Sequence, residues 1–216
     1  MKKTYLPFII FISILFNSCF GLKIDIQMNR NGSGKLTLEY RISETLTNIG
    51  NYEGNEHLPV IPAGRADWQR TISRIEGARL ASFSSSQKGQ DTVTTVIINF
   101  ANPQALLAVL DPALKKSDIT IDNNSGVFNL ILNEAISKEY DKNLMDLARS
   151  AFADYNFSIT FNGPANSTLL ITDGNGNPTS PSVALNVVLS GRKVSLSIGV
   201  MDLIEVDGGL GIQVNW

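Results

Sequence analysis

The sequence predicts an α+β fold, with a mainly antiparallel sheet of about ten strands and about three helices covering one side of it. Short segments that alternate apolar and polar residues follow one another along the chain, and tight turns rather than helical crossovers join them. Other segments place apolar residues three and four positions apart, as on one face of a helix. The sheet is expected to be curved or to form a half-barrel.

Most strands are expected to come as hairpins. Leu22, Ile24, Ile26 and Met28 occupy alternate positions, and the same alternation returns over residues 35–42. The stretch RNGSG between them supplies Asn and Gly, which accept the positive φ angles of a tight connection. Further strands are predicted over residues 78–86, 92–100, 118–122, 127–133, 156–162, 167–172, 182–190, 194–200 and 210–216.

Two short helices are predicted in the first half of the chain. Trp68, Ile72 and Ile75 are spaced four and three apart, which gives one apolar stripe on a helix. Asn102 is a favourable cap for a second helix over residues 103–110, which begins with proline. Both stripes are expected to face the core.

The clearest helix is predicted near residues 138–155. Its apolar residues follow the i, i+3, i+4, i+7, i+8 spacing of a helix that lies on a sheet. Such a stripe belongs more often to a core than to a ligand site, but it is also the candidate wall of an apolar groove. The groove would be lined by Leu144, Leu147, Ala148, Ala151 and Phe152.

The N-terminus has the layout of an export signal. Lys2 and Lys3 precede an apolar run over residues 4–16, which is shorter than the roughly 20 residues of a membrane-spanning helix. Ser18 then supplies the small residue that a signal peptidase needs just before its cut. Cys19 follows, and it is the single cysteine of the chain.

The stretch Leu15–Cys19 resembles a bacterial lipobox, with Phe16 where Leu is usual. The resemblance implies that Cys19 becomes the new N-terminus and is acylated by diacylglycerol, with chains such as palmitate. The alternatives are an ordinary secretory signal with a bystander cysteine, or an uncleaved N-terminal anchor. On the lipoprotein interpretation, residues 1–18 are the signal peptide and residues 19–216 form one domain. Its location would be the bacterial cell envelope, outside the cytoplasm, on a periplasmic or outer-membrane face.

The composition argues against nucleic acid as a partner. Removing Lys2 and Lys3 from the 18 basic side chains leaves 16 against 20 acidic ones, a formal charge of −4. This balance provides neither a basic footprint for nucleic acid nor a polybasic patch for anionic lipid. With a single cysteine the mature chain has no internal disulfide, so its stability must come from a hydrophobic core.

Few residues suggest chemistry. His57, the single histidine, lies in a predicted surface loop over residues 46–64, without partners for a zinc site or a catalytic triad. Asp202, Glu205 and Asp207 gather three carboxylates near the C-terminus. Since no basic or metal-binding partner is close in sequence, a solvated turn is favoured over an acid/base site.

The best candidate metal site of the sequence occurs in the stretch DGNGNPTSPSVA. Asp173, Asn175 and Asn177 occupy alternate positions, as the first ligands of a calcium loop do. Pro178 replaces the glycine that such a loop needs for its sharp turn, and Ala184 stands where the bidentate Glu should be. A plain turn is therefore predicted, without a metal.

The order of the elements is a further pattern. It runs from the lipobox cysteine through the hairpin NRNGSGKLTLEYRIS to the later segments VIINF, FNGPANSTLLIT and GIQVNW. This order resembles the LppM-like domain of bacterial lipoproteins over most of residues 19–216. The resemblance implies an α+β domain similar to lipid-binding folds, without catalytic residues, and an affinity for polar lipids of the cell envelope.

Two functions of different classes are expected, neither of them enzymatic and neither with a cofactor. In the first, the anchored domain binds or handles a polar lipid, and the stripe from Leu144 to Phe152 lines the groove. In the second, the domain is a tethered interaction module that presents the 46–64 loop to a protein partner or to a host.

Overall fold

The computed structural model describes residues 21–43, 64–89, 91–111, 117–122, 125–134, 146, 149, 152–153 and 155–216. This part of the chain contains eleven named strands and three named helices. The strands are β1 Gly21–Met28, β2 Gly34–Ser43, β3 Ala78–Lys88, β4 Asp91–Phe100, β5 Asp118–Asp122, β6 Ser125–Glu134, β7 Asn156–Asn162, β8 Thr168–Thr172, β9 Asn186–Ser190, β10 Lys193–Gly199 and β11 Gly209–Asn215. The helices are α3 Arg65–Ile72, α4 Pro103–Leu110 and α6 Val200–Glu205.

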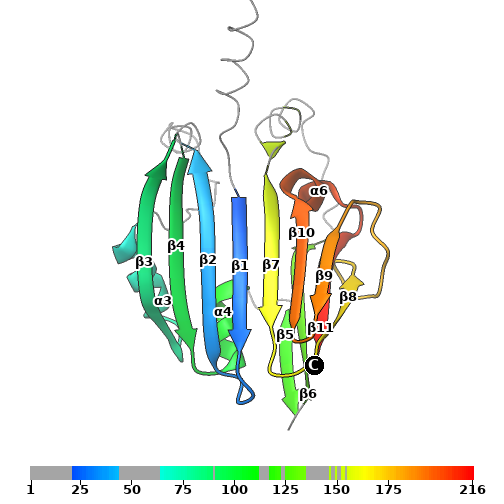
Figure 1. Cartoon of the computed structure of the whole chain (residues 1–216), viewed down its shortest axis with the longest axis horizontal. Coiled ribbons are helices and arrows are strands. Elements are labelled where there is room, and N and C mark those ends of the chain that lie inside the picture. The colour runs from blue at the N-terminus through cyan, green and yellow to red at the C-terminus, as the bar shows by residue number, and fades with distance from the viewer. Residues whose placement is uncertain are drawn as a thin grey trace, which may run out of the picture.

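The strands form two open sheets. Seven strands make a large sheet in the order β3-β4-β2-β1-β7-β10-β9, and four make a smaller one in the order β5-β6-β11-β8 (Figure 1). All strand pairs are antiparallel except β1 and β7, which are parallel. The α+β class and the antiparallel character are therefore confirmed, with one strand more than the ten expected and two sheets in place of one.

The first hairpin forms as the turn residues predict. Asn29 N donates to Ser33 O at 2.8 Å, and Gly32 N donates to Asn29 O at 3.0 Å. Gly32 has a φ of 78°, a left-handed conformation that costs glycine nothing and strains other residues. The turn sets the register of β1 against β2, and that register places Ile24 opposite Leu38. The β3-β4 and β5-β6 hairpins are also confirmed.

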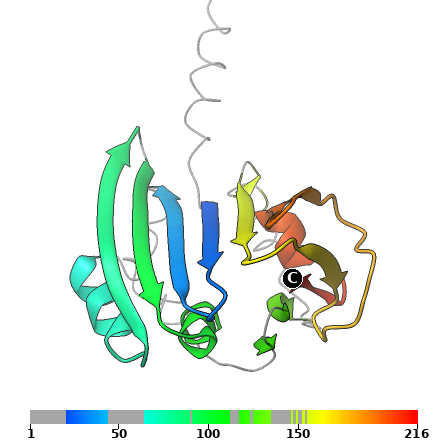
Figure 2. The same cartoon turned by 60° about the horizontal axis from the view of Figure 1, so that its bottom comes forward.

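Alternation along the strands gives the large sheet one buried face. The small sheet and the helices cover this face from behind, as the two views show (Figures 1 and 2). The rings of Phe128 on β6 and Phe161 on β7 join the two sheets, with centroids 5.6 Å apart, and Trp216 lies 5.1 Å from Phe161. Each fully buried side chain of this kind contributes about 1.5–3 kcal/mol of transfer free energy.

The first two helices cover the other half of the buried face. Trp68 and Ile72 of α3 are buried, and Trp68 Nε1 donates to the hydroxyl of Tyr40 at 3.0 Å. Helix α4 begins where predicted, because the Asn102 side chain accepts a hydrogen bond from Ala105 N at 2.8 Å. Both helices are therefore confirmed.

The third predicted helix, over residues 138–155, lies mostly outside the described residues. Within it, Asp146, Arg149 and Phe152 are helical. A short helix that the sequence did not predict, α6, follows β10 directly. Its six residues are too few to establish a helical period in the sequence.

Candidate functional site

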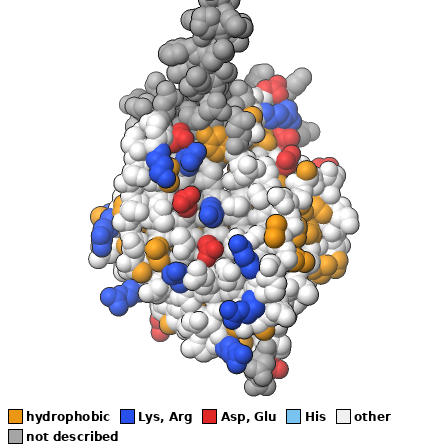
Figure 3. Space-filling model, in the orientation of Figure 1, with side chains coloured by type: hydrophobic (Ala, Val, Ile, Leu, Met, Phe, Trp, Pro, Cys, Tyr) orange, Lys and Arg blue, Asp and Glu red, His pale blue; other side chains and the backbone are white. Residues whose placement is uncertain are grey.

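The open face of the large sheet is polar along its central strands. Lys23, Asp25 and Gln27 alternate with the buried residues of β1, and Glu39 and Arg41 do the same on β2. Figure 3 shows this face, with basic and acidic side chains distributed across it. Among the described residues, neither the helices nor the small sheet covers this face (Figure 1).

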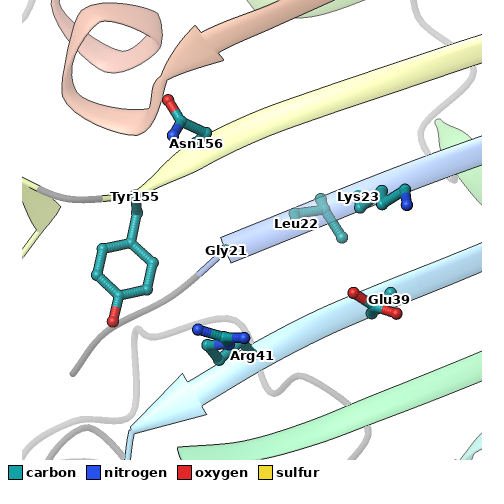
Figure 4. A pocket seen from close by; sticks show the side chains of 7 residues that line it. All are labelled: Gly21, Leu22, Lys23, Glu39, Arg41, Tyr155 and Asn156. Atoms are coloured by element: carbon teal, nitrogen blue, oxygen red, sulfur yellow. The ribbon is translucent and has the colours of Figure 1, made fainter. Parts of the chain in front are cut away.

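A pocket of about 360 Å³ opens on this face, where β1 and β7 begin and β2 ends (Figure 4). It is bounded by three neighbouring strands of the large sheet and the residue that precedes β7. Its lining consists of Gly21, Leu22, Lys23, Glu39, Arg41, Tyr155 and Asn156.

Gly21 contributes only its backbone to the lining of the pocket. Gly21 lies opposite Arg41 in the β1-β2 register. A Cβ atom at Gly21 would meet Tyr155 Cδ1 at 3.6 Å and the carbonyl oxygen of Asn156 at 3.8 Å, both ordinary contact distances. A Cβ atom at position 21 is therefore accommodated without a shift of its neighbours, and a side chain there would take up space in the pocket that Gly21 lines.

The pocket carries charges of both signs. Lys23 lies directly opposite Glu39 on the neighbouring strand. Arg41 lies two residues beyond Glu39 on β2, on the same face of the sheet. Its Nε is 3.7 Å from Asp91 Oδ2 on β4. The lining thus offers two cations and one carboxylate, a set that can bind an anionic group with a positively charged group beside it.

Asp91 supports Arg41 from outside the pocket. Its side chain is only 9% exposed, whereas that of Arg41 is 52% exposed. Asp91 Oδ1 is buried and has no hydrogen-bond partner among the described residues. Because a buried carboxylate is costly without a countercharge, Asp91 favours keeping the Arg41 guanidinium close to this end of the sheet.

Most residues singled out from the sequence lie outside the described part of the chain. Ser18 and Cys19 precede Gly21, the first described residue, and His57 falls in the 46–64 segment, of which only Gly64 is described. In the predicted apolar groove, Leu144, Leu147, Ala148 and Ala151 also lie outside it. Phe152 is described: it is helical, and it is half-buried.

The acidic group near the C-terminus is exposed to solvent as expected, but only Asp207 of the three lies in a turn. Asp202 and Glu205 belong to helix α6, and Asp207 follows it. Arg149 Nε is 2.8 Å from Glu205 Oε1, and Arg149 Nη1 is 3.0 Å from Asp146 Oδ1. The hydrogen bond and the charge of Glu205 raise the pKa of Arg149. The basic partner was missed because it is distant in sequence.

Asp173 organises a turn through its own carboxylate. Its Oδ1 accepts hydrogen bonds from the backbone N–H groups of Asn175 at 2.8 Å and Asn177 at 2.9 Å. Its Oδ2 accepts from the Asn177 side chain at 3.2 Å. The backbone hydrogen bond from Asn177, followed by the side-chain bond from the same residue, lowers the pKa of Asp173. These bonds direct both carboxylate oxygens into the turn.

Sequence reasoning missed the pocket residues as a group. The hairpin register alone could have paired Lys23 with Glu39, since the turn at Gly32 determines which residues of β1 and β2 face each other. Tyr155 and Asn156 reach the pocket only because β7 lies parallel to β1. That contact joins segments more than a hundred residues apart, and no local pattern indicates it.

The described residues contain neither a metal-binding cluster nor a membrane-spanning helix. No group of three or more His, Cys, Asp or Glu side chains there could hold a metal ion. None of the helices described has the length and apolar character to cross a bilayer. In the comparisons with known proteins, no family model, curated protein or solved structure matches the chain.

Proposed function

We propose that this chain is a non-catalytic, lipid-anchored protein of the bacterial cell envelope that binds the polar head group of a lipid in the pocket at Gly21. The observation that carries the proposal is the position of the pocket. Its floor lies two residues after Cys19, and two residues of extended chain span at most about 7 Å. If Cys19 carries diacylglycerol, the pocket opens at the surface of the bilayer.

The chemistry of the lining supports a head group rather than an acyl chain. Lys23 and Arg41 can bind a phosphate, and Glu39 lies beside them for an amine, as in a zwitterionic phospholipid. A volume of about 360 Å³ lies at the lower end of the range for small-molecule sites. In contrast, the space between the sheets is filled by side chains such as Phe128 and Phe161.

The proposal keeps the resemblance to LppM-like lipoproteins but moves the ligand site. The expected groove along Leu144 to Phe152 and the interaction loop over residues 46–64 lie largely outside the described residues. Both stay predictions. The pocket at Gly21 has the advantage that its residues, register and charges are defined.

Acyl labelling tests the anchor. Cells expressing the full chain are fed an alkyne analogue of palmitate, and we expect the protein to be labelled and recovered with the membranes. Cys19→Ala should abolish the label, whereas Ser18→Ala keeps a small residue before the cut and should preserve it. Equal labelling of Cys19→Ala would reject Cys19 as the anchor.

Native mass spectrometry of the full chain in detergent micelles tests the head-group site. Short-chain phosphatidylethanolamine and phosphatidylglycerol are titrated separately, and one-to-one adducts are counted. Gly21→Val should take up part of the pocket without changing charge and weaken binding about tenfold, or about 1.4 kcal/mol. It is preferable to Arg41→Gln, which would also leave Asp91 without its countercharge.

The matched control is Lys35→Gln on the same strand and face as Arg41. It removes one positive charge outside the pocket lining and should leave the adducts unchanged. Loss of adducts in Lys35→Gln but not in Gly21→Val would indicate general charge attraction. Unchanged adducts in Gly21→Val would place the lipid elsewhere on the molecule.

A further inference from the structure

Strand β9 exposes an unusual run of apolar side chains. Val187, Val188 and Leu189 are consecutive and are 40%, 51% and 55% exposed. They account for three of the five large hydrophobic residues that are exposed in the described part of the chain. Figure 3 shows hydrophobic side chains gathered at this edge of the molecule. An exposed apolar run of this kind is typical of an interaction surface.

The backbone of β9 is also open on one side. It is the last strand of the large sheet, and it pairs with β10 alone. Among the described residues, no backbone hydrogen bond joins β9 to the connection over residues 173–185 that leads into it. Half of its N–H and C=O groups therefore point away from the sheet, where another strand could bind them.

The sequence of β9 is self-complementary. Asn186 and Ser190 are polar, and the three residues between them are apolar. In an antiparallel pair centred on Val188, Val187 faces Leu189 of the partner subunit. Such a pair aligns apolar with apolar and polar with polar residues on both sheet faces.

The charges near β9 are also compatible with an antiparallel pair of two β9 strands. Strand β9 contains no charged residue, although natural edge strands are commonly protected by Lys, Pro or a bulge. In the register centred on Val188, the paired residues run from Asn186 to Ser190, and the nearest charged residues along the chain, Arg192 and Lys193, belong to the turn after β9 and to β10. No like charges meet.

From these observations we propose that a second copy of this chain binds β9 through an antiparallel, two-fold symmetric pair centred on Val188. The large sheets of the two copies then form one continuous sheet across the axis. A contact of five residues on each side is small compared with a stable soluble dimer. The association is accordingly expected to be weak, and covalent capture is the way to detect it. The proposal does not depend on the pocket or its ligand.

Cysteine cross-linking in membranes tests the pair directly. Val188→Cys places identical residues opposite each other at Cα distances of about 4.5–5.5 Å, within the range that a disulfide spans. We expect Val188→Cys in the full chain to form a dimer on copper phenanthroline oxidation, resolved by non-reducing electrophoresis. Wild type reports the background from Cys19, and Ser84→Cys reports collision at the exposed opposite edge, β3. A dimer yield no greater than that of these two controls would overturn the proposal.

The register is tested by a mixed pair. Coexpressed Val187→Cys and Leu189→Cys chains, distinguished by size tags, should cross-link to each other more than either does to itself. Adding Val188→Lys to both chains puts two lysines opposite each other. The yield of cross-linked heterodimer should then fall at least about fivefold. Val188 is half exposed, so lysine is expected to be tolerated in the monomer. Persistence of the heterodimer with lysine present would contradict the two-fold pair.

Discussion

The two edges of the large sheet are built differently. Strand β3 has eleven residues, a register shift between Leu80 and Ser82, and basic residues near both ends. Helix α3 contacts it from behind. Strand β9 has five residues, no charge and three exposed apolar side chains. Bulges and charged residues are devices that prevent one sheet from pairing with another.

The difference indicates which edge belongs to the fold and which is left for a partner. Behind the β3 edge, helix α3 contacts β3, and its Trp68 donates a buried hydrogen bond to Tyr40 on β2, which ties the helix to the sheet. At the β9 edge, the apolar residues that would need such cover are exposed. The contrast implies that substitutions behind β3 cost far more folding stability than substitutions on β9.

The largest effect is expected behind the β3 edge. Ile72 is 1% exposed on helix α3, and Ile72→Ala would remove buried atoms and leave a cavity. We expect a loss of about 2–5 kcal/mol in the free energy of unfolding, measured by urea denaturation. Thr71→Ala, on the exposed side of the same helix, should change it by no more than about 0.5 kcal/mol. Similar values for the two variants would show that β3 does not depend on α3.

A smaller effect is expected from the hydrogen bond in the same region. Trp68→Phe removes the indole N–H that donates to the Tyr40 hydroxyl at 3.0 Å. The coupling free energy in a double-mutant cycle with Tyr40→Phe should be about 0.5–1.5 kcal/mol. A coupling of zero would mean that packing alone holds α3 to the sheet.

A pH-dependent effect is expected in the connection that leads to β9. Because the pKa of Asp173 is lowered in the folded state, its charged form stabilises the fold above the unfolded pKa of about 4. That contribution is lost as the pH falls through the lowered pKa. The thermal midpoint of Asp173→Asn should therefore lie below that of wild type at pH 6–7, and the two should converge as the pH approaches 2.

Asp207→Asn is the control for this titration. Asp207 is exposed in a neighbouring turn, and the substitution removes the same charge. A pH profile for Asp173→Asn that follows that of Asp207→Asn would contradict a specific role for the hydrogen bonds of Asp173.

The smallest effect is expected on β9 itself. Val188→Thr replaces a methyl by a hydroxyl on a half-exposed side chain, and the free energy of unfolding of the monomer should change by less than about 0.5 kcal/mol. The same substitution at Val96, which is fully buried on β4, should cost about 1–3 kcal/mol because it buries a hydroxyl. Equal costs at the two positions would mean that β9 is covered in the folded chain.

Local patterns in the sequence predicted the parts that local forces specify. The alternation of Leu22 to Met28, together with the turn at Gly32, was sufficient for the first hairpin. Asn102 before Pro103 was sufficient for the start of α4. Helix α6 was missed because six residues carry no clear period, and the charge partner of Glu205 was missed because Arg149 is 56 residues away.

The sequence by itself determined which residues form strands, which face of each strand is buried and where the main turns fall. Only the tertiary structure decided that β7 lies between β1 and β10, which places Asn156 beside Gly21, and that β9 forms an edge. The physical reason is that a period of two specifies the faces of a strand but not its neighbours. Neighbours are selected by packing between segments that are distant in sequence, and only the folded chain brings those segments together.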